Sequence, residues 1–250
     1  MTSKIVISIP INLSNRQEIA AVLASKYGAE YVFMGRIFQS TIADQSCEID
    51  IGIAVPNLVT VWDNAGQAKI SLATRQQIDG HRQVIYLTSN ATGYDACREI
   101  AQLAQVFLQI GGIAIKVESA GIAHEKQQWL EHYNSADVFA IYSLFVMLIE
   151  GEETYYSCGM SNFSKADVTL DVIEDLGLAI YVMNVFNYYR LTESPILQDG
   201  HTFQPDIECP TYQMKWKADG ESEPDSPLYN PHGRWHLSRK SIVIDYSVDD

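Results

Sequence analysis

Residues 154–171 form the stretch that most constrains how this chain can fold. Residues 154–158 are rich in Thr and Tyr, which fit the pleated, half-buried surface of a strand. Gly159 follows at once and indicates a backbone conformation that a Cβ would strain, or the close approach of another segment. A polar turn over residues 161–165 then leads into a second extended run, residues 166–170. The stretch therefore predicts two strands joined through a glycine-bearing turn.

The N-terminal half predicts a sheet. Residues 4–9 are apolar on both faces, which favours a central strand, and residues 47–55 alternate as a half-exposed antiparallel strand does. Pro56-Asn57 turns the chain into residues 58–62, which we expect to pair with residues 47–55 as a hairpin. Further strands are expected at residues 31–38, 84–87, 113–117, 201–203, 212–216, 234–237 and 242–246.

Helices are predicted where apolar residues recur three and four positions apart. Ser14 and Gln17 have the spacing of a capping box, so a helix is expected to start there and to stop at Gly28. Residues 92–110 are the clearest surface helix, and Gly111 ends it. Residues 124–133 read as a short amphipathic segment, and residues 136–148 as a mostly apolar, buried helix. A long helix is expected at about residues 172–191, with a stripe of Ile173, Leu176, Ile180, Met183 and Phe186.

The order of these elements predicts an α+β fold with a mixed, largely antiparallel sheet packed against several helices. At 250 residues the chain can bury a sizeable core. We expect a single domain over residues 1–250, with a sub-division near residue 120 as the alternative.

The charge of the chain limits the classes of partner that it is expected to bind. The formal net charge is -14; residues 1–150 carry 10 basic and 14 acidic side chains, and residues 151–250 carry 7 and 17. Negative charge repels phosphate backbones and anionic lipids, which argues against nucleic acid and membrane partners. The excess favours either simple solubility or attraction for a basic protein partner. The candidate binding residues are acids of the C-terminal region: Asp206, Glu208, Glu221, Glu223 and Asp225.

Cysteine usage and hydropathy point to a reduced, cytoplasmic protein without a cofactor. Cys47, Cys97, Cys158 and Cys209 form no C-x-x-C pair, so a cysteine zinc site is not expected. The start of the chain lacks the pattern of a signal peptide. The longest apolar run, residues 138–149, is too short to span a bilayer.

The sequence gives only weak evidence for a catalytic or metal-binding site. Cys158 beside Gly159 has the local setting of a nucleophile, but no histidine lies within fifteen residues, and a buried structural cysteine is the simpler interpretation. His232 and His236 have a helical metal spacing, which Pro231 and Gly233 disfavour. Asp199 with His201, and Asp206 with Glu208, could serve acid–base or cation-binding chemistry, although a solvated edge explains them equally. The chain has no P-loop, no G-x-G-x-x-G and no G-x-S-x-G.

One pattern resembles that of a bacterial domain-of-unknown-function family, number 4261, over roughly residues 113–205. The residues that carry the resemblance are Thr154, Gly159, Met160, Phe163 and Asp167, followed after the long helix by Asp199, Gly200 and Thr202. Ser164 stands where that family has glycine. The resemblance implies a bacterial, cytosolic protein of the toxin-neutralising or accessory kind, and it transfers no activity to any residue.

These observations favour a non-enzymatic acidic binding protein, in its most specific form a bacterial immunity protein that neutralises a basic toxin. Complementary charge speeds the association of such pairs and suppresses wrong partners. The alternative is a hydrolase or transferase whose site is assembled only in the fold, with Cys158 and a distant histidine.

Overall fold

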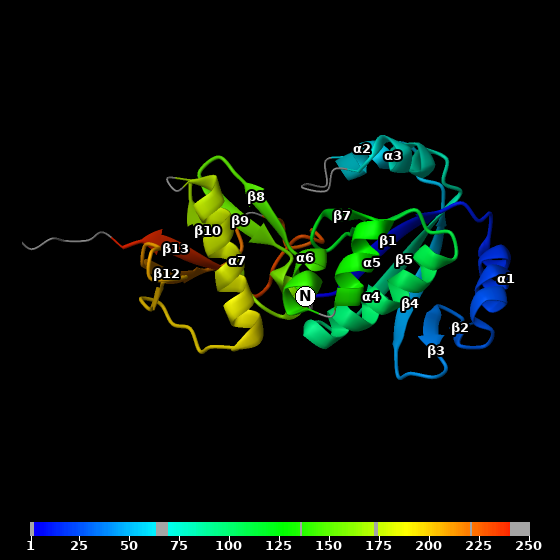
Figure 1. Ribbon diagram of the computed structural model, residues 1–250, viewed down its shortest axis with the longest axis horizontal. Coiled ribbons are helices and arrows are strands. Elements are labelled where there is room, and N and C mark those ends of the chain that lie inside the picture. Colours follow the sequence, from blue (N-terminus) through cyan, green and yellow to red (C-terminus); the bar gives the residue numbers. More distant parts are fainter. Residues whose placement is uncertain (1–2, 64–69, 136, 173–174, 221, 241–250) are drawn as a thin grey trace, which may run out of the picture.

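The computed structural model describes residues 3–63, 70–135, 137–172, 175–220 and 222–240. These residues form seven α-helices and two mostly antiparallel sheets, which confirms the predicted α+β class. Figure 1 shows the two sheets at opposite ends of an elongated molecule, with α6 (Val138–Phe145) between them. The single-domain prediction remains a prediction.

The first sheet has seven strands in the order β2-β3-β4-β5-β1-β6-β7, and every neighbouring pair is antiparallel. As predicted, β1 is central, and β4 alternates between more and less buried side chains from Cys47 to Asp50. The alternation does not continue to Ile53, which is 81% exposed. The strand bounds are β1 Ile5–Ile11, β2 Tyr31–Met34, β3 Ile37–Ser40, β4 Ser46–Ile53, β5 Gln83–Ser89, β6 Ala114–Val117 and β7 Ile122–Glu125.

Helices cover both faces of this sheet. On one face, α4 (Tyr94–Gln109) buries the predicted stripe, including Ile100 and Phe107, against Ile85 and Leu87. On the other, α2 (Leu58–Asp63) and α3 (Leu72–Asp79) pack over Val84 and Ala114. Helix α1 (Arg16–Tyr27) lies beside β2, and α5 (Lys126–Ser135) follows β7.

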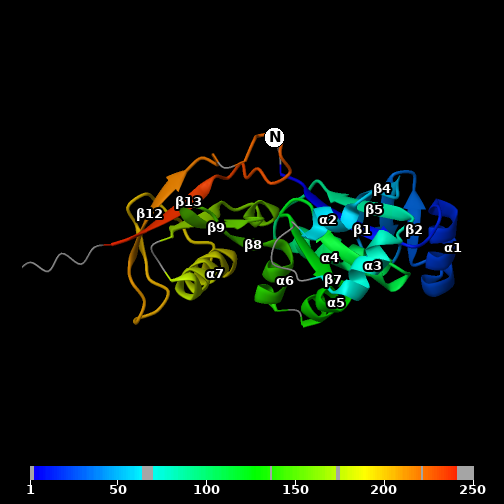
Figure 2. The same cartoon turned by 90° about the horizontal axis from the view of Figure 1, so that it is seen from above.

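The second sheet has six strands in the order β11-β12-β13-β10-β9-β8, and β10 and β13 form its one parallel pair. Helix α7 (Leu176–Thr192) packs on one face through Val182, Met183 and Phe186. The chain between β12 and β13 runs along the opposite side, as Figure 2 shows. The strand bounds are β8 Met147–Glu150, β9 Thr154–Cys158, β10 Asp167–Asp171, β11 Thr202–Phe203, β12 Tyr212–Lys217 and β13 Arg234–Arg239.

The turn after β9 joins the two halves. Gly159 has φ +116°, and a Cβ there would lie 2.1 Å from the carbonyl oxygen of Phe145, so both the special conformation and the close approach predicted for it are confirmed. In the short 3₁₀ helix Met160–Phe163, Asn162 donates to the same Phe145 oxygen (3.2 Å) and accepts from the Ser119 hydroxyl (2.7 Å). Two side-chain hydrogen bonds and a glycine contact therefore hold this turn against the first half of the chain.

Several local predictions were wrong. Residues 58–62 are helical rather than a strand, because Leu58 and Trp62, one turn apart, are both buried against the first sheet. Residues 31–38 are a hairpin whose turn contains Gly35 at φ +62°. The cap of α1 is Asn15, whose side chain accepts from the backbone N–H of Glu18 (2.9 Å), one position beyond the predicted box.

The later helices also differ from their predictions. The amphipathic segment divides into β7 and α5, and the apolar run divides into α6 and β8, because both strands find antiparallel partners in the sheets. Helix α7 begins at Leu176, and its buried side centres on Val182 and Phe186, which leaves Leu176 and Ile180 45% and 38% exposed. Ile173 and the predicted strand at residues 242–246 lie outside the described residues.

Candidate functional site

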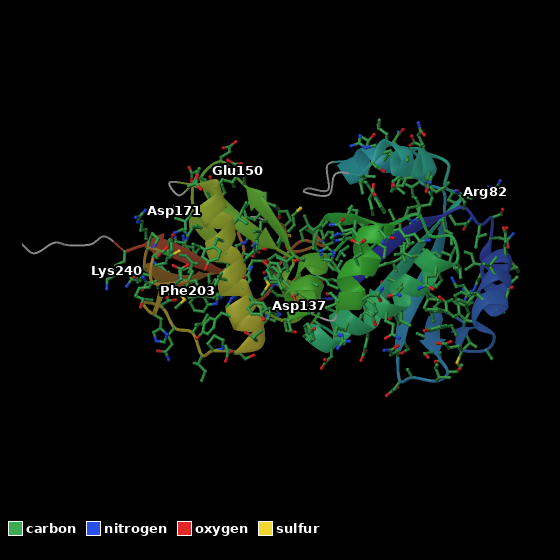
Figure 3. The ribbon with its side chains drawn as sticks, viewed as in Figure 1. Arg82, Asp137, Glu150, Asp171, Phe203 and Lys240 are labelled. Atoms are coloured by element: carbon green, nitrogen blue, oxygen red, sulfur yellow. The ribbon has the colours of Figure 1, made fainter. Side chains whose placement is uncertain are left out.

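A groove of about 720 Å³ lies between α7 and the segment that leads through β11 to β12. One wall is Val185 and Tyr189 of α7, and Met214 of β12 lies across from it. Phe203 packs against Phe186 with ring centroids 4.9 Å apart, and Figure 3 shows Phe203 beside α7. The remaining lining residues come from one stretch of chain: Pro195, Ile196, Leu197, Gly200, His201, Thr202, Gln204 and Pro205.

The mouth of this groove is apolar. Ile196 is 86% exposed and Ile207, in the loop that follows β11, is 92% exposed. A side chain of this size stays in water at a cost. Ile196 lines the groove and Ile207 follows the lining residue Pro205 by two positions, so this segment presents a surface suited to a partner.

The same segment carries only acidic charge. Residues 191–214 contain four acids and no Lys or Arg, and all four acids are exposed: Glu193, Asp199, Asp206 and Glu208. Glu193 is the C-cap of α7, where the helix dipole adds negative potential of its own. Lys215, the next basic residue, follows the buried Met214 and so points to the other face of the sheet. The groove is therefore lined largely by apolar side chains, and the segment that supplies most of its lining carries only acidic charge. We refer to it as the acidic groove.

Asp206 accepts several hydrogen bonds that fix the position of its side chain. Its carboxylate accepts from the Tyr181 hydroxyl (2.8 Å) and from the backbone N–H groups of Glu208 (2.8 Å) and Cys209 (3.0 Å). The Tyr181 hydrogen bond, with those of the two N–H groups, lowers the pKa of Asp206 below its usual value. The loop that presents Ile207 and Glu208 is thus held in a defined shape with its charge fixed.

Of the five acids predicted to bind a partner, the four that the structure describes fall into two separate groups. Asp206 and Glu208 lie before β12, whereas Glu223 and Asp225 lie in the loop after it. The two loops are at opposite ends of a six-residue strand, roughly 17 Å apart along its axis. Asp225 instead lines a cavity of about 380 Å³ with Lys4. Glu221 lies outside the described residues.

Cys158 has the properties of a structural residue. It is 3% exposed at the end of β9, and burial, with a smaller contribution from Asp167, raises its pKa to about 12. A thiol with so high a pKa is protonated at neutral pH and is a poor nucleophile.

The histidines singled out in the sequence are also dispersed. His201 lines the acidic groove, and His232 lies in the loop between β12 and β13. His236, on β13, contacts the Thr169 hydroxyl (3.0 Å) and lies 3.5 Å from Asp171. Within the described ranges, no group of three or more His, Cys, Asp or Glu side chains is arranged to hold a metal ion.

One buried network of polar side chains, centred on Asp167, was not predicted from the sequence. Asp167 accepts from the Ser157 hydroxyl (2.9 Å), the Met160 N–H (3.2 Å) and the Asn230 amide (2.6 Å). Burial raises the pKa of Asp167, and these hydrogen bonds oppose that rise. Asn230 stands 63 positions away in the sequence, so no local pattern could have indicated the pair. The network ties the loop between β12 and β13 to the start of β10.

Comparison with known proteins adds no relative: no family model, curated protein or solved structure matches the chain. Across the described segments, no helix has the length and hydropathy needed to cross a membrane. The resemblance to family 4261 therefore remains a prediction.

Proposed function

We propose that this protein is a non-enzymatic binding protein that docks a basic segment of a protein partner in the groove between α7 and β11. The observation that carries the proposal is a largely apolar groove. Most of its lining comes from a segment of 24 residues that contains four exposed acids and no Lys or Arg. A partner that places an apolar side chain in the groove and Lys or Arg side chains around it would match both features.

The physical contributions of the two features differ. Apolar side chains buried in the groove would supply most of the affinity, with Ile196 and Ile207 as the exposed contacts. The acids would mainly speed association, because opposite charges steer partners together before contact. Neutralisation of a basic toxin by an immunity protein, the function expected from the sequence, is one case of such binding.

The test uses two variants that remove the same charge, one from the two segments that flank the groove lining and one from the loop after β12. Glu193→Gln with Glu208→Gln changes the groove, and Glu223→Gln with Asp225→Asn is the matched control. Each protein is used to capture partners from the source cells, and association with the captured partner is then followed by stopped flow at low and high salt.

We expect the captured partner to be basic and the groove variant to associate roughly tenfold more slowly at low salt, a difference that high salt reduces. The control variant should associate nearly as fast as the native protein. A partner whose association is insensitive to salt, or equally slow with both variants, would contradict docking at this groove.

A further inference from the structure

A second groove, of about 420 Å³, lies where α5, α6 and α7 meet β7 and β8. Its contact with α7 is through Ile180 and Asn184, whereas Val185 and Tyr189 of that helix line the acidic groove. Among the described residues that line it there is no Asp, Glu, Lys or Arg. Its apolar lining is Ile122, Phe139, Val146, Leu148 and Ile180, and the polar side chains of Gln128, His132 and Ser143 also line it. A site of this size and character suits a small uncharged molecule.

His124, on β7, is the unusual residue of this groove. It is 2% exposed, and its Nε2 lies 3.0 Å from the carbonyl oxygen of Leu144. Because that oxygen can only accept, Nε2 carries the proton and Nδ1 presents a lone pair. Nδ1 is buried and no hydrogen bond of regular geometry reaches it; its interaction with the nearby Gln128 side chain is weak and only partly opposes the fall in the pKa of the ring.

An unpartnered buried acceptor is costly to a fold. A polar atom that loses water without gaining a partner destabilises the folded protein, so such atoms are rare. Burial, as the largest cause, lowers the pKa of His124 to about 4, which keeps the ring neutral and Nδ1 an acceptor at pH 7. A ligand with an N–H or O–H group would satisfy this atom.

A donor lies in the same groove. The Asn184 side-chain oxygen accepts from the Tyr142 hydroxyl (3.0 Å), and that hydroxyl accepts from the Asn187 amide (3.1 Å). The Asn184 oxygen is therefore occupied, which leaves the N–H₂ end of its amide to donate. The groove thus combines an acceptor, a donor and apolar walls.

We propose that this groove binds a small uncharged molecule with an apolar, ring-sized body and an N–H or O–H donor, which His124 Nδ1 accepts. The site is independent of the acidic groove, and neither proposal rests on the other.

Indole and 1-methylindole provide a matched pair of probes, because the methyl group removes the N–H donor and leaves the apolar ring. Binding to the full-length protein is followed by NMR through the ring nitrogen resonances of His124 and by calorimetry. We expect indole to shift the Nδ1 resonance and 1-methylindole to bind about tenfold more weakly, the effect of one lost hydrogen bond.

Two tryptophan substitutions locate the binding. Ile180→Trp places a large ring at the partly exposed edge of the groove and should abolish the shift, whereas Ile53→Trp, at an exposed position of β4, should not. Circular dichroism and melting temperature establish that both variants are folded. Equal binding of the two probes, no binding of indole at millimolar concentration, or an unchanged response in Ile180→Trp would each overturn the proposal.

Discussion

At the scale of single residues, Gly159 is the position most sensitive to a small change. A Cβ there would meet the Phe145 oxygen at 2.1 Å and the Ala120 Cβ at 2.8 Å, and the φ of +116° disfavours any other residue. We expect Gly159→Ala to lower the free energy of unfolding by about 3 kcal/mol or more, from backbone strain together with overpacking. Urea denaturation followed by circular dichroism measures the change.

A substitution at Gly35 separates the effect of backbone strain from the effect of overpacking. Gly35 also has a left-handed φ, of +62°, but a Cβ there would have nothing within 4 Å. Gly35→Ala should therefore cost only the strain, about 1 kcal/mol. If both variants lost the same stability, the contact with Phe145 would not be the cause, and the turn would not hold the two halves together as described.

At the scale of elements, Asn230 attaches the loop between β12 and β13 to β10. Its amide donates to Asp167 (2.6 Å) and to the Lys165 carbonyl oxygen (3.0 Å). Asn230→Ala would leave a buried carboxylate with one donor fewer, and we expect a loss of about 3 kcal/mol at pH 7. The loop should also become open to limited proteolysis, whereas Glu223→Ala, at an exposed position of the same loop, should change neither property.

The pH dependence of this loss has a definite sign. Burial raises the pKa of Asp167, so the folded protein binds that proton more readily than the unfolded chain. The ionised carboxylate therefore costs stability as the pH rises through its folded pKa, and protonation relieves the cost. Asn230→Ala should recover part of its lost stability when the pH is lowered from 7 and Asp167 becomes protonated. A loss that grows on acidification would show that Asp167 is not the residue responsible.

At the scale of the whole molecule, the second sheet has a hydrophobic core of its own, and the residues that connect it to the first half belong to the core of the first sheet. Phe145, Met160 and Phe163 belong to the same buried cluster as Ile7 and Ile100 of the first half. We therefore expect a single unfolding transition, as the single-domain prediction requires. A variant with Trp216→Phe and Trp235→Phe keeps fluorescence only from Trp62 and Trp129, in the first half.

Fluorescence of that variant and circular dichroism of its whole chain should give the same urea midpoint. The reciprocal variant, with Trp62→Phe and Trp129→Phe, reports on the second sheet. Its fluorescence and circular dichroism should also share one midpoint, at a lower urea concentration because both replaced side chains are buried. Two separate midpoints would instead favour two domains that unfold independently.

Local periodicity was sufficient for the elements whose pattern agrees with their final burial. Residues 4–9, apolar on both faces, became the central strand β1, and the stripe of residues 92–110 became the buried side of α4. Gly159 was also recognisable, because the need for a residue without a Cβ is a property of its own backbone. These features, and the α+β class, follow from short-range constraints.

The tertiary structure decided the rest. The β-branched residues 59–61 favour a strand locally, but burial of Leu58 and Trp62 on one side made the segment helical. The positions of the acids depended on strand order, which placed two of them at each end of β12 rather than on one face. The groove around His124 was not visible in the sequence, because α5, α6, α7, β7 and β8 become neighbours only in the fold. The acidic groove comes from residues 185–214, and it depends on how this stretch folds back against α7. The unpartnered Nδ1 of His124 is likewise a consequence of packing: which polar atoms lose water is determined by long-range contacts.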